Sequence, residues 1–138
     1  MFKTKVGYSQ NPDACASGAE SAAMAQLADA KVGLLFTSCV LDQEAVVKGI
    51  RSVAGTHVLG CTSSAAICVK DGYLNSEDGY SGIMSFGGDV EVGVAGAAKG
   101  EDECAREIGR KLACEAMSPL GGLAPDYFFM TASPAEEE

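Results

Sequence analysis

The chain has no tryptophan and only one histidine, His57, in 138 residues. A metal site built from several imidazole groups is therefore excluded. The six cysteines include no Cys-x-x-Cys pair, and Cys61 and Cys68 are poorly spaced for zinc. We expect no metal and no cofactor, and we interpret most of the cysteines as small buried hydrophobic residues.

Clusters of basic residues are also missing, and the formal net charge is −9. This charge argues against binding to nucleic acid or to an anionic membrane surface. No apolar run approaches the length of a membrane span, and Lys3 and Lys5 are followed by a polar stretch at 7–12, where a signal peptide would be hydrophobic. We therefore expect a cytoplasmic acidic protein without structural disulfides.

The chain alternates short apolar runs with helical patterns, which suits one domain spanning 1–138 with a real hydrophobic core. The patterns first predict a strand at 3–8, a helix from an Asn11 cap to about Ala30, a strand at 31–39, a helix from an Asp42 cap to about Val53 and a strand at 57–61. They then predict extended segments at 67–74, 80–86 and 90–97, a helix at 101–117 and a buried strand at 126–131. The continuous apolar run at 31–39 is typical of a central parallel strand, so 31–61 predicts a right-handed βαβ unit.

Two segments resemble each other internally. Residues 34–45 and 127–138 both read as an apolar triplet, small polar residues and an acidic helix start. In the second copy Ser133 and Glu136 match a capping box. We therefore expect the natural domain to continue past Glu138; a frayed acidic tail is the alternative. The predicted fold class is α/β, with a parallel-core sheet holding the βαβ unit, an antiparallel strand extension and the start of a second repeat half.

A polar loop after the predicted strand at 57–61 is the candidate site. Val58 and Leu59 are interpreted as the last buried residues of that strand, and Gly60 as a turn or a point of close approach. A thiol and three hydroxyls follow, at the strand end where open α/β sheets bind ligands. The predicted ligand-binding residues are Thr37, Ser38, Gly60, Cys61, Thr62, Ser63 and Ser64. The alternative is that these hydroxyls only satisfy nearby backbone groups.

Cys61 is the one candidate nucleophile in this loop. Its only possible histidine base, His57, lies four strand residues away, which is about 13 Å. An enzyme of the Cys–His type is therefore not expected within this chain. His57 as a haem ligand is a further alternative, against a structural role at a strand start.

The chain resembles the N-terminal domain of the FIST family, sensory modules of signal transduction proteins. The resemblance rests on Val6-Gly7-Tyr8-Ser9, on Ala16-Ser17-Gly18-Ala19-Glu20, on Leu34-Leu35-Phe36 before an acidic helix with Gly49-Ile50, on Gly60-Cys61-Thr62-Ser63, and on Tyr127-Phe128-Phe129. The chain departs from the family pattern at Ala65-Ala66, where the family has Gly-Glu. The glutamate carboxylate that is missing here would help to bind a ligand or to fix the loop.

The resemblance implies a sensory domain that binds a small, amino-acid-like ligand and passes a signal to a downstream domain or protein, without catalysis. Some relatives resemble haem-based nitric oxide sensors. Two alternatives stay open, an enzyme that uses Cys61 and an interaction fragment that binds no ligand. An incomplete sheet would also favour a homo-oligomer.

Overall fold

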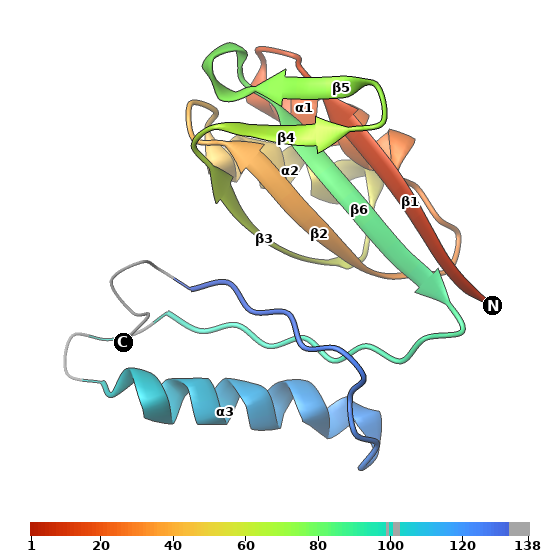
Figure 1. Cartoon of the computed structure of the whole chain (residues 1–138), viewed down its shortest axis with the longest axis vertical. Coiled ribbons are helices and arrows are strands. Elements are labelled where there is room, and N and C mark those ends of the chain that lie inside the picture. Colours follow the sequence, from red (N-terminus) through yellow and green to blue (C-terminus); the bar gives the residue numbers. More distant parts are fainter. Residues whose placement is uncertain (99, 101–102, 133–138) are drawn as a thin grey trace. The chain divides into compact units, whose positions relative to one another are not determined.

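The computed structural model describes residues 1–98, 100 and 103–132. The chain divides into two compact units, Met1–Val90 and Glu91–Glu138, each considered by itself below. The elements are β1 (Phe2–Ser9), α1 (Ala14–Met24), β2 (Ala30–Ser38), α2 (Gln43–Val53), β3 (His57–Ser63), β4 (Ala66–Val69), β5 (Gly72–Asn75), the 3-10 turn η1 (Ser76–Asp78) and β6 (Ser81–Gly88) in the first unit, and α3 (Ala105–Met117) and the 3-10 turn η2 (Ser118–Leu120) in the second (Figure 1). The fold is α/β, as predicted.

The first unit is built on a four-stranded sheet in the order β1-β6-β2-β3 (Figure 1). β2 and β3 pair in parallel, with Leu35 beside Gly60 and Thr37 beside Thr62, which confirms the predicted βαβ unit. β6 is antiparallel to both of its neighbours, β1 and β2. The antiparallel part is therefore not a meander added after the parallel strands, because β6 inserts between the first two strands of the chain.

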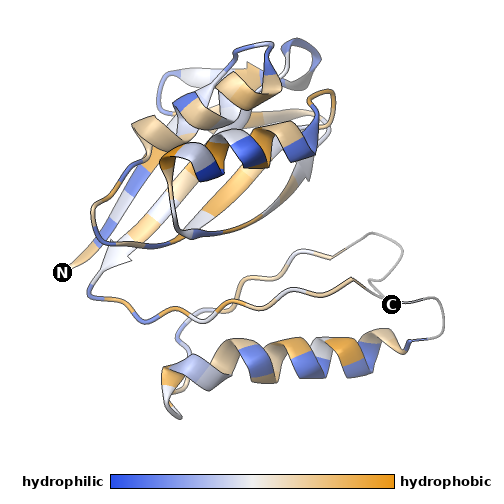
Figure 2. Cartoon of the chain, turned by 180° about the vertical axis from the view of Figure 1, so that it is seen from behind, coloured by the Kyte–Doolittle hydropathy of each residue, from blue (hydrophilic) through white to orange (hydrophobic). Residues whose placement is uncertain are grey.

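Helices α1 and α2 pack side by side behind the sheet, and the hydrophobic core lies beneath them (Figures 1 and 2). Val46 and Ile50 of α2 are fully buried there, against Leu35 and Ile83 of the sheet. The two helices touch through glycine at their crossing. A Cβ atom on Gly49 would lie 2.0 Å from the carbonyl oxygen of Cys15, so only glycine allows this approach.

The helix caps agree in part with the sequence prediction. Asp42 caps α2, and its side chain accepts a hydrogen bond from the Ala45 N–H at 3.1 Å. In α1 the cap is Asp13 rather than Asn11, whose side chain instead accepts from the Asp13 N–H. α1 also ends at Met24, well before Ala30, because the chain needs the intervening residues to reach the start of β2.

A separate hairpin of β4 and β5 lies on the opposite face of the sheet from the helices (Figure 1). It replaces the single extended segment predicted at 67–74. Gly72 adopts φ +128° where the hairpin returns, a conformation that favours glycine. The hairpin is held to the sheet by a hydrogen bond from the Tyr8 hydroxyl to Asp71, and Ile67 lies over Gly82 of β6.

The second unit contains α3 but no strand among its described residues. The strand predicted at 126–131 is therefore wrong, and Tyr127 is 95% exposed rather than buried; the extended segment predicted at 90–97 also forms no strand. A strand is stable only when its backbone groups pair with a neighbour, and no described segment pairs with either of these. The predicted helix at 101–117 begins at Ala105; residues 101–102, and the helix start predicted at Ser133, lie outside the described residues.

Candidate functional site

The loop that the sequence predicted as the site is largely strand. β3 does not end at Cys61, as predicted, but continues to Ser63, because Thr62 and Ser63 extend the ladder with the end of β2. Gly60 is therefore not a turn. It allows close approach instead, since a Cβ atom there would lie 1.9 Å from the carbonyl oxygen of Leu35.

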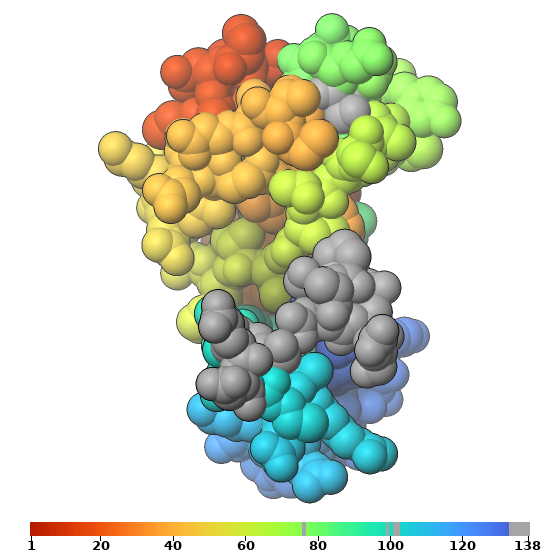
Figure 3. All heavy atoms as spheres, turned by 90° about the vertical axis from the view of Figure 1, so that its left-hand side faces the viewer, coloured from red at the N-terminus to blue at the C-terminus, as the bar shows by residue number. Residues whose placement is uncertain are grey.

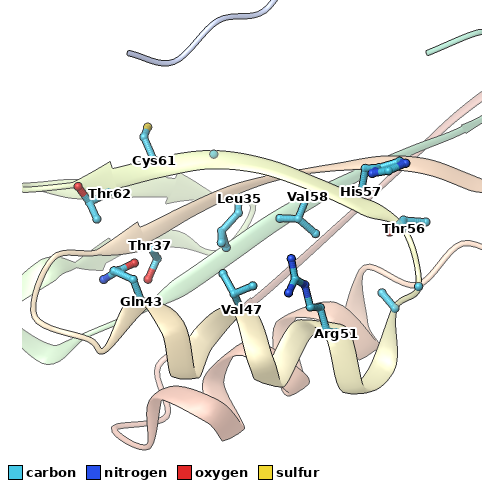
Figure 4. A pocket seen from close by; sticks show the side chains of 13 residues that line it. Leu35, Thr37, Gln43, Val47, Arg51, Thr56, His57, Val58, Cys61 and Thr62 are labelled. Atoms are coloured by element: carbon cyan, nitrogen blue, oxygen red, sulfur yellow. The ribbon is translucent and has the colours of Figure 1, made fainter. Parts of the chain in front are cut away.

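Strand geometry separates the predicted site residues. Successive side chains of a strand point to opposite faces, so the Thr62 and Cys61 side chains project from opposite sides of the sheet. In Figure 4 the Thr62 side chain points toward α2, while the Cys61 thiol points away from it. The predicted cluster of one thiol and three hydroxyls is thus divided between two faces.

A groove of about 630 Å³ lies between α2 and β3, of the size that small-molecule sites have. A recess is visible there beside the yellow surface of α2 (Figure 3). The groove is lined by Leu35, Thr37, Gln43, Val47, Arg51, Ala54, Gly55, Thr56, His57, Val58, Gly60, Cys61 and Thr62 (Figure 4). Four of the seven predicted residues are in this set, namely Thr37, Gly60, Cys61 and Thr62.

The remaining three, Ser38, Ser63 and Ser64, do not line the groove. Ser38 is fully buried, and its hydroxyl accepts a hydrogen bond from the Val40 N–H at 3.3 Å. The Ser63 hydroxyl donates to the Ala66 carbonyl at 3.5 Å. Ser38 and Ser63 therefore serve the backbone, as the alternative interpretation of this loop expected. A ligand-binding role for any of the seven residues stays a prediction.

Thr37 connects the groove to the core of the sheet. It is 2% exposed, and its hydroxyl donates a 3.0 Å hydrogen bond to the carbonyl oxygen of Tyr80, just before β6. This bond fixes the side chain, yet the hydroxyl oxygen keeps lone-pair capacity to accept another. The Thr37 hydroxyl is thus a fixed polar group in the lining of the groove.

The residues that the sequence analysis missed come mainly from α2. Gln43, Val47 and Arg51 are spaced four apart, so they form one stripe on the helix, and in Figure 4 their side chains rise toward β3. The Gln43 amide nitrogen donates to the carbonyl oxygens of Ser38 at 2.9 Å and Leu41 at 2.6 Å. This stripe, adjacent to the buried one at Val46 and Ile50, was the signal available in the sequence.

The charge of the groove differs from that of the chain. Arg51 and His57 line it, but no aspartate or glutamate does, whereas the whole chain carries −9. Within residues 1–98, 100 and 103–132, Arg51 forms no ion pair with a carboxylate. The guanidinium group is therefore available to an anion from solution.

The groups with shifted pKa values lie elsewhere. Hydrogen bonds from Ser9 and Asn11 lower the pKa of Glu20, and the hydrogen bond to Asp71 raises the pKa of Tyr8. Among the described residues no group of three or more histidine, cysteine or acidic side chains is arranged to hold a metal ion. In the same residues no helix is both long enough and apolar enough to cross a membrane.

Comparison with known proteins identifies the family. The model of the FIST N domain matches residues 31–138, which include β2, α2, β3 and every later element. The similar features at 6–9 and 16–20 lie outside this match. A search of curated proteins finds no match. Because the family model spans well over half of the chain, the chain belongs to the FIST N domain family, whose members are in general sensory domains of signal transduction.

Proposed function

We propose that the chain is a cytoplasmic sensory domain that binds a small organic ligand in the groove between α2 and β3 and signals to a downstream domain. The observation that carries the proposal is the groove itself, which combines apolar walls with a few fixed polar groups and the Arg51 guanidinium, which pairs with no described carboxylate. The walls come from Leu35, Val47 and Val58, and the polar groups include Thr37 and Thr62.

The family resemblance implies an amino-acid-like ligand, and the groove suits the carboxylate end of such a ligand. Its carboxylate would bind Arg51, and its side chain would lie along Val47 and Val58. Ligand binding would stabilise α2 against β3, so the helix is the element that would carry the signal. These two elements are consecutive in the chain and are joined by the short loop at 54–56.

The proposal is tested by a thermal-shift screen of the chain against amino acids, small carboxylates, nucleobases and haem. A ligand that binds the folded state raises the melting temperature in proportion to the logarithm of its concentration. Thr62→Tyr would fill the groove and abolish the shift. Thr4→Tyr is the matched control, because Thr4 is an exposed strand residue far from the groove lining.

Two outcomes would contradict ligand sensing in this groove. The first is a shift that Thr62→Tyr and Thr4→Tyr reduce equally. The second is the absence of any shift across the screen, together with a dimeric mass in light scattering, which would favour an interaction fragment. The enzyme hypothesis has less support, because Cys61 points away from α2 and its distance from His57 along β3 is about 13 Å.

A further inference from the structure

Among the residues that line the α2–β3 groove, Arg51 is the one that carries a formal charge at pH 7. Arg51 rises from α2 into this lining, which includes no aspartate or glutamate, while Glu44 lines the adjoining hollow on α2 together with Arg51. A bound carboxylate would therefore meet a cationic partner, while a bound ammonium would meet only neutral oxygens. This asymmetry bears on which class of small molecule the groove selects.

Arg51 lies where it can bind such a carboxylate. Its side chain rises from the last turn of α2 toward β3, beside Val58 (Figure 4). No described carboxylate competes for it. The planar guanidinium can donate two parallel hydrogen bonds to a carboxylate, which fixes the orientation of the ligand as well as adding affinity.

The rest of the lining next to Arg51 is apolar. Val47 precedes Arg51 by one helical turn on the same stripe, and Val58 faces it from β3, with Leu35 behind (Figure 4). Both valines also pack against the hydrophobic core, so these walls are held in place. A short aliphatic chain attached to the carboxylate would fill this part of the groove and lose its contact with water.

We propose that the ligand of this groove is a short aliphatic monocarboxylate that lacks an amino group. The inference rests on the proposed function and narrows the class of ligand. An amino group is excluded because an α-amino acid would place its ammonium next to the Arg51 guanidinium without an anionic partner in the groove lining. The experiment therefore includes an amino acid of the same skeleton.

The test is calorimetric titration of the chain with three ligands of one carbon skeleton: 4-methylpentanoate, its primary amide, and leucine. We expect 4-methylpentanoate to bind about tenfold or more tightly than the amide and leucine, the size of effect that a charge-assisted hydrogen bond gives. Arg51→Gln should remove this preference. Lys48→Gln, which removes the same charge from α2 outside the groove lining, should retain it.

Leucine binding as tightly as 4-methylpentanoate, or a preference that survives Arg51→Gln, would overturn the inference. So would a failure of all three compounds to bind. The thermal-shift screen separates these failures from failure of the proposed function. A compound outside this series would still support ligand sensing in the groove if its thermal shift is lost in Thr62→Tyr and kept in Thr4→Tyr. The melting temperatures of Arg51→Gln and Lys48→Gln, measured without ligand, separate a binding defect from a folding defect.

Discussion

The two units of the chain differ in what their helices contact. In Met1–Val90, α2 buries Val46 and Ile50 completely against a four-stranded sheet. In the second unit, α3 has a similar amphipathic pattern, yet none of its residues is buried. Helix propensity and periodicity are therefore comparable, and the difference lies in the sheet. A helix gains most of its stability from packing an apolar face rather than from its own hydrogen bonds.

Two apolar triplets make the same comparison for strands. Leu34-Leu35-Phe36 lies in β2 and pairs with β6 on one side and β3 on the other. Tyr127-Phe128-Phe129 has a similar composition, but it forms no strand, and its three side chains are 46% to 95% exposed. An apolar triplet becomes a central strand only when two neighbouring strands supply hydrogen-bond partners.

Truncation of a core side chain should give the largest difference in the free energy of unfolding between the two units. Ile50→Ala in α2 should lower the free energy of unfolding by about 2–5 kcal/mol, because it leaves a cavity in a packed core. Leu112→Ala in α3 should cost a small fraction of that, since Leu112 is only half-buried. Urea denaturation followed by circular dichroism measures both. Equal losses would contradict the contrast between the units.

Glycine substitutions should have opposite signs in the two units. Gly49→Ala should lower the free energy of unfolding by about 1–3 kcal/mol, because the new Cβ meets the Cys15 carbonyl oxygen. Gly109→Ala in α3 meets no atom within 4 Å. It should therefore stabilise α3 by about 1 kcal/mol, the ordinary propensity difference. Urea denaturation reports the first change and amide hydrogen exchange in α3 the second. Destabilisation by both variants would disprove the prediction.

Helix caps provide a smaller comparison. Asp42→Ala removes a side-chain cap and should cost about 1 kcal/mol. The N-cap residue of α3 is Cys104, which makes no side-chain cap hydrogen bond, and Glu107 stands at the third helical position. Cys104→Ser would complete a capping box and should stabilise α3 by about 0.5–1 kcal/mol. Hydrogen exchange in the first turn of α3 measures the gain, and unchanged exchange would show that the cap does not limit this helix.

The smallest expected effect is on pH dependence. Hydrogen bonds from the Ser9 hydroxyl at 2.5 Å and the Asn11 amide at 2.8 Å lower the pKa of Glu20 below its ordinary value of about 4.5. The stability that they provide is present above that ordinary value and is lost as the pH falls through the lowered one. Glu20→Gln should thus weaken the first unit at pH 7 and make its stability less sensitive to acid.

The control for this experiment is Glu91→Gln, an exposed glutamate of the second unit. Urea midpoints of the three proteins are compared at pH 7 and at about pH 3, on either side of the expected transition. The same pH dependence in Glu20→Gln as in the unsubstituted chain would show that this carboxylate does not contribute.

Local features of the fold were predictable because they depend on neighbours in the sequence. Asp42 was predicted as a cap, which is confirmed, and the continuous apolar run before it is a central strand that pairs in parallel with β3 but antiparallel with β6. The position of β6 between β1 and β2 was not predictable in this way. Its pairing joins residues far apart in the chain, and nothing in the pattern of 80–86 specifies which strands it will separate.

In the candidate site, too, local sequence was not sufficient, because the arrangement of its residues depends on pairing between distant segments. Thr62 and Ser63 have the composition of a loop, and only their pairing with Thr37 and Ser38 makes them strand. That pairing divides the predicted cluster between two faces of the sheet. Arg51 was overlooked for a related reason, since an exposed arginine in a helix becomes a candidate ligand-binding group only once β3 is known to lie opposite.

The sequence by itself thus determined the order of elements from β1 to β3, the cap of α2, the parallel βαβ unit and the family of the chain. The tertiary structure alone decided which apolar segments became strands and which side chains share the groove. The physical reason is that caps and periodicity act over one or two helical turns, whereas strand pairing and burial depend on segments that the chain brings together only on folding.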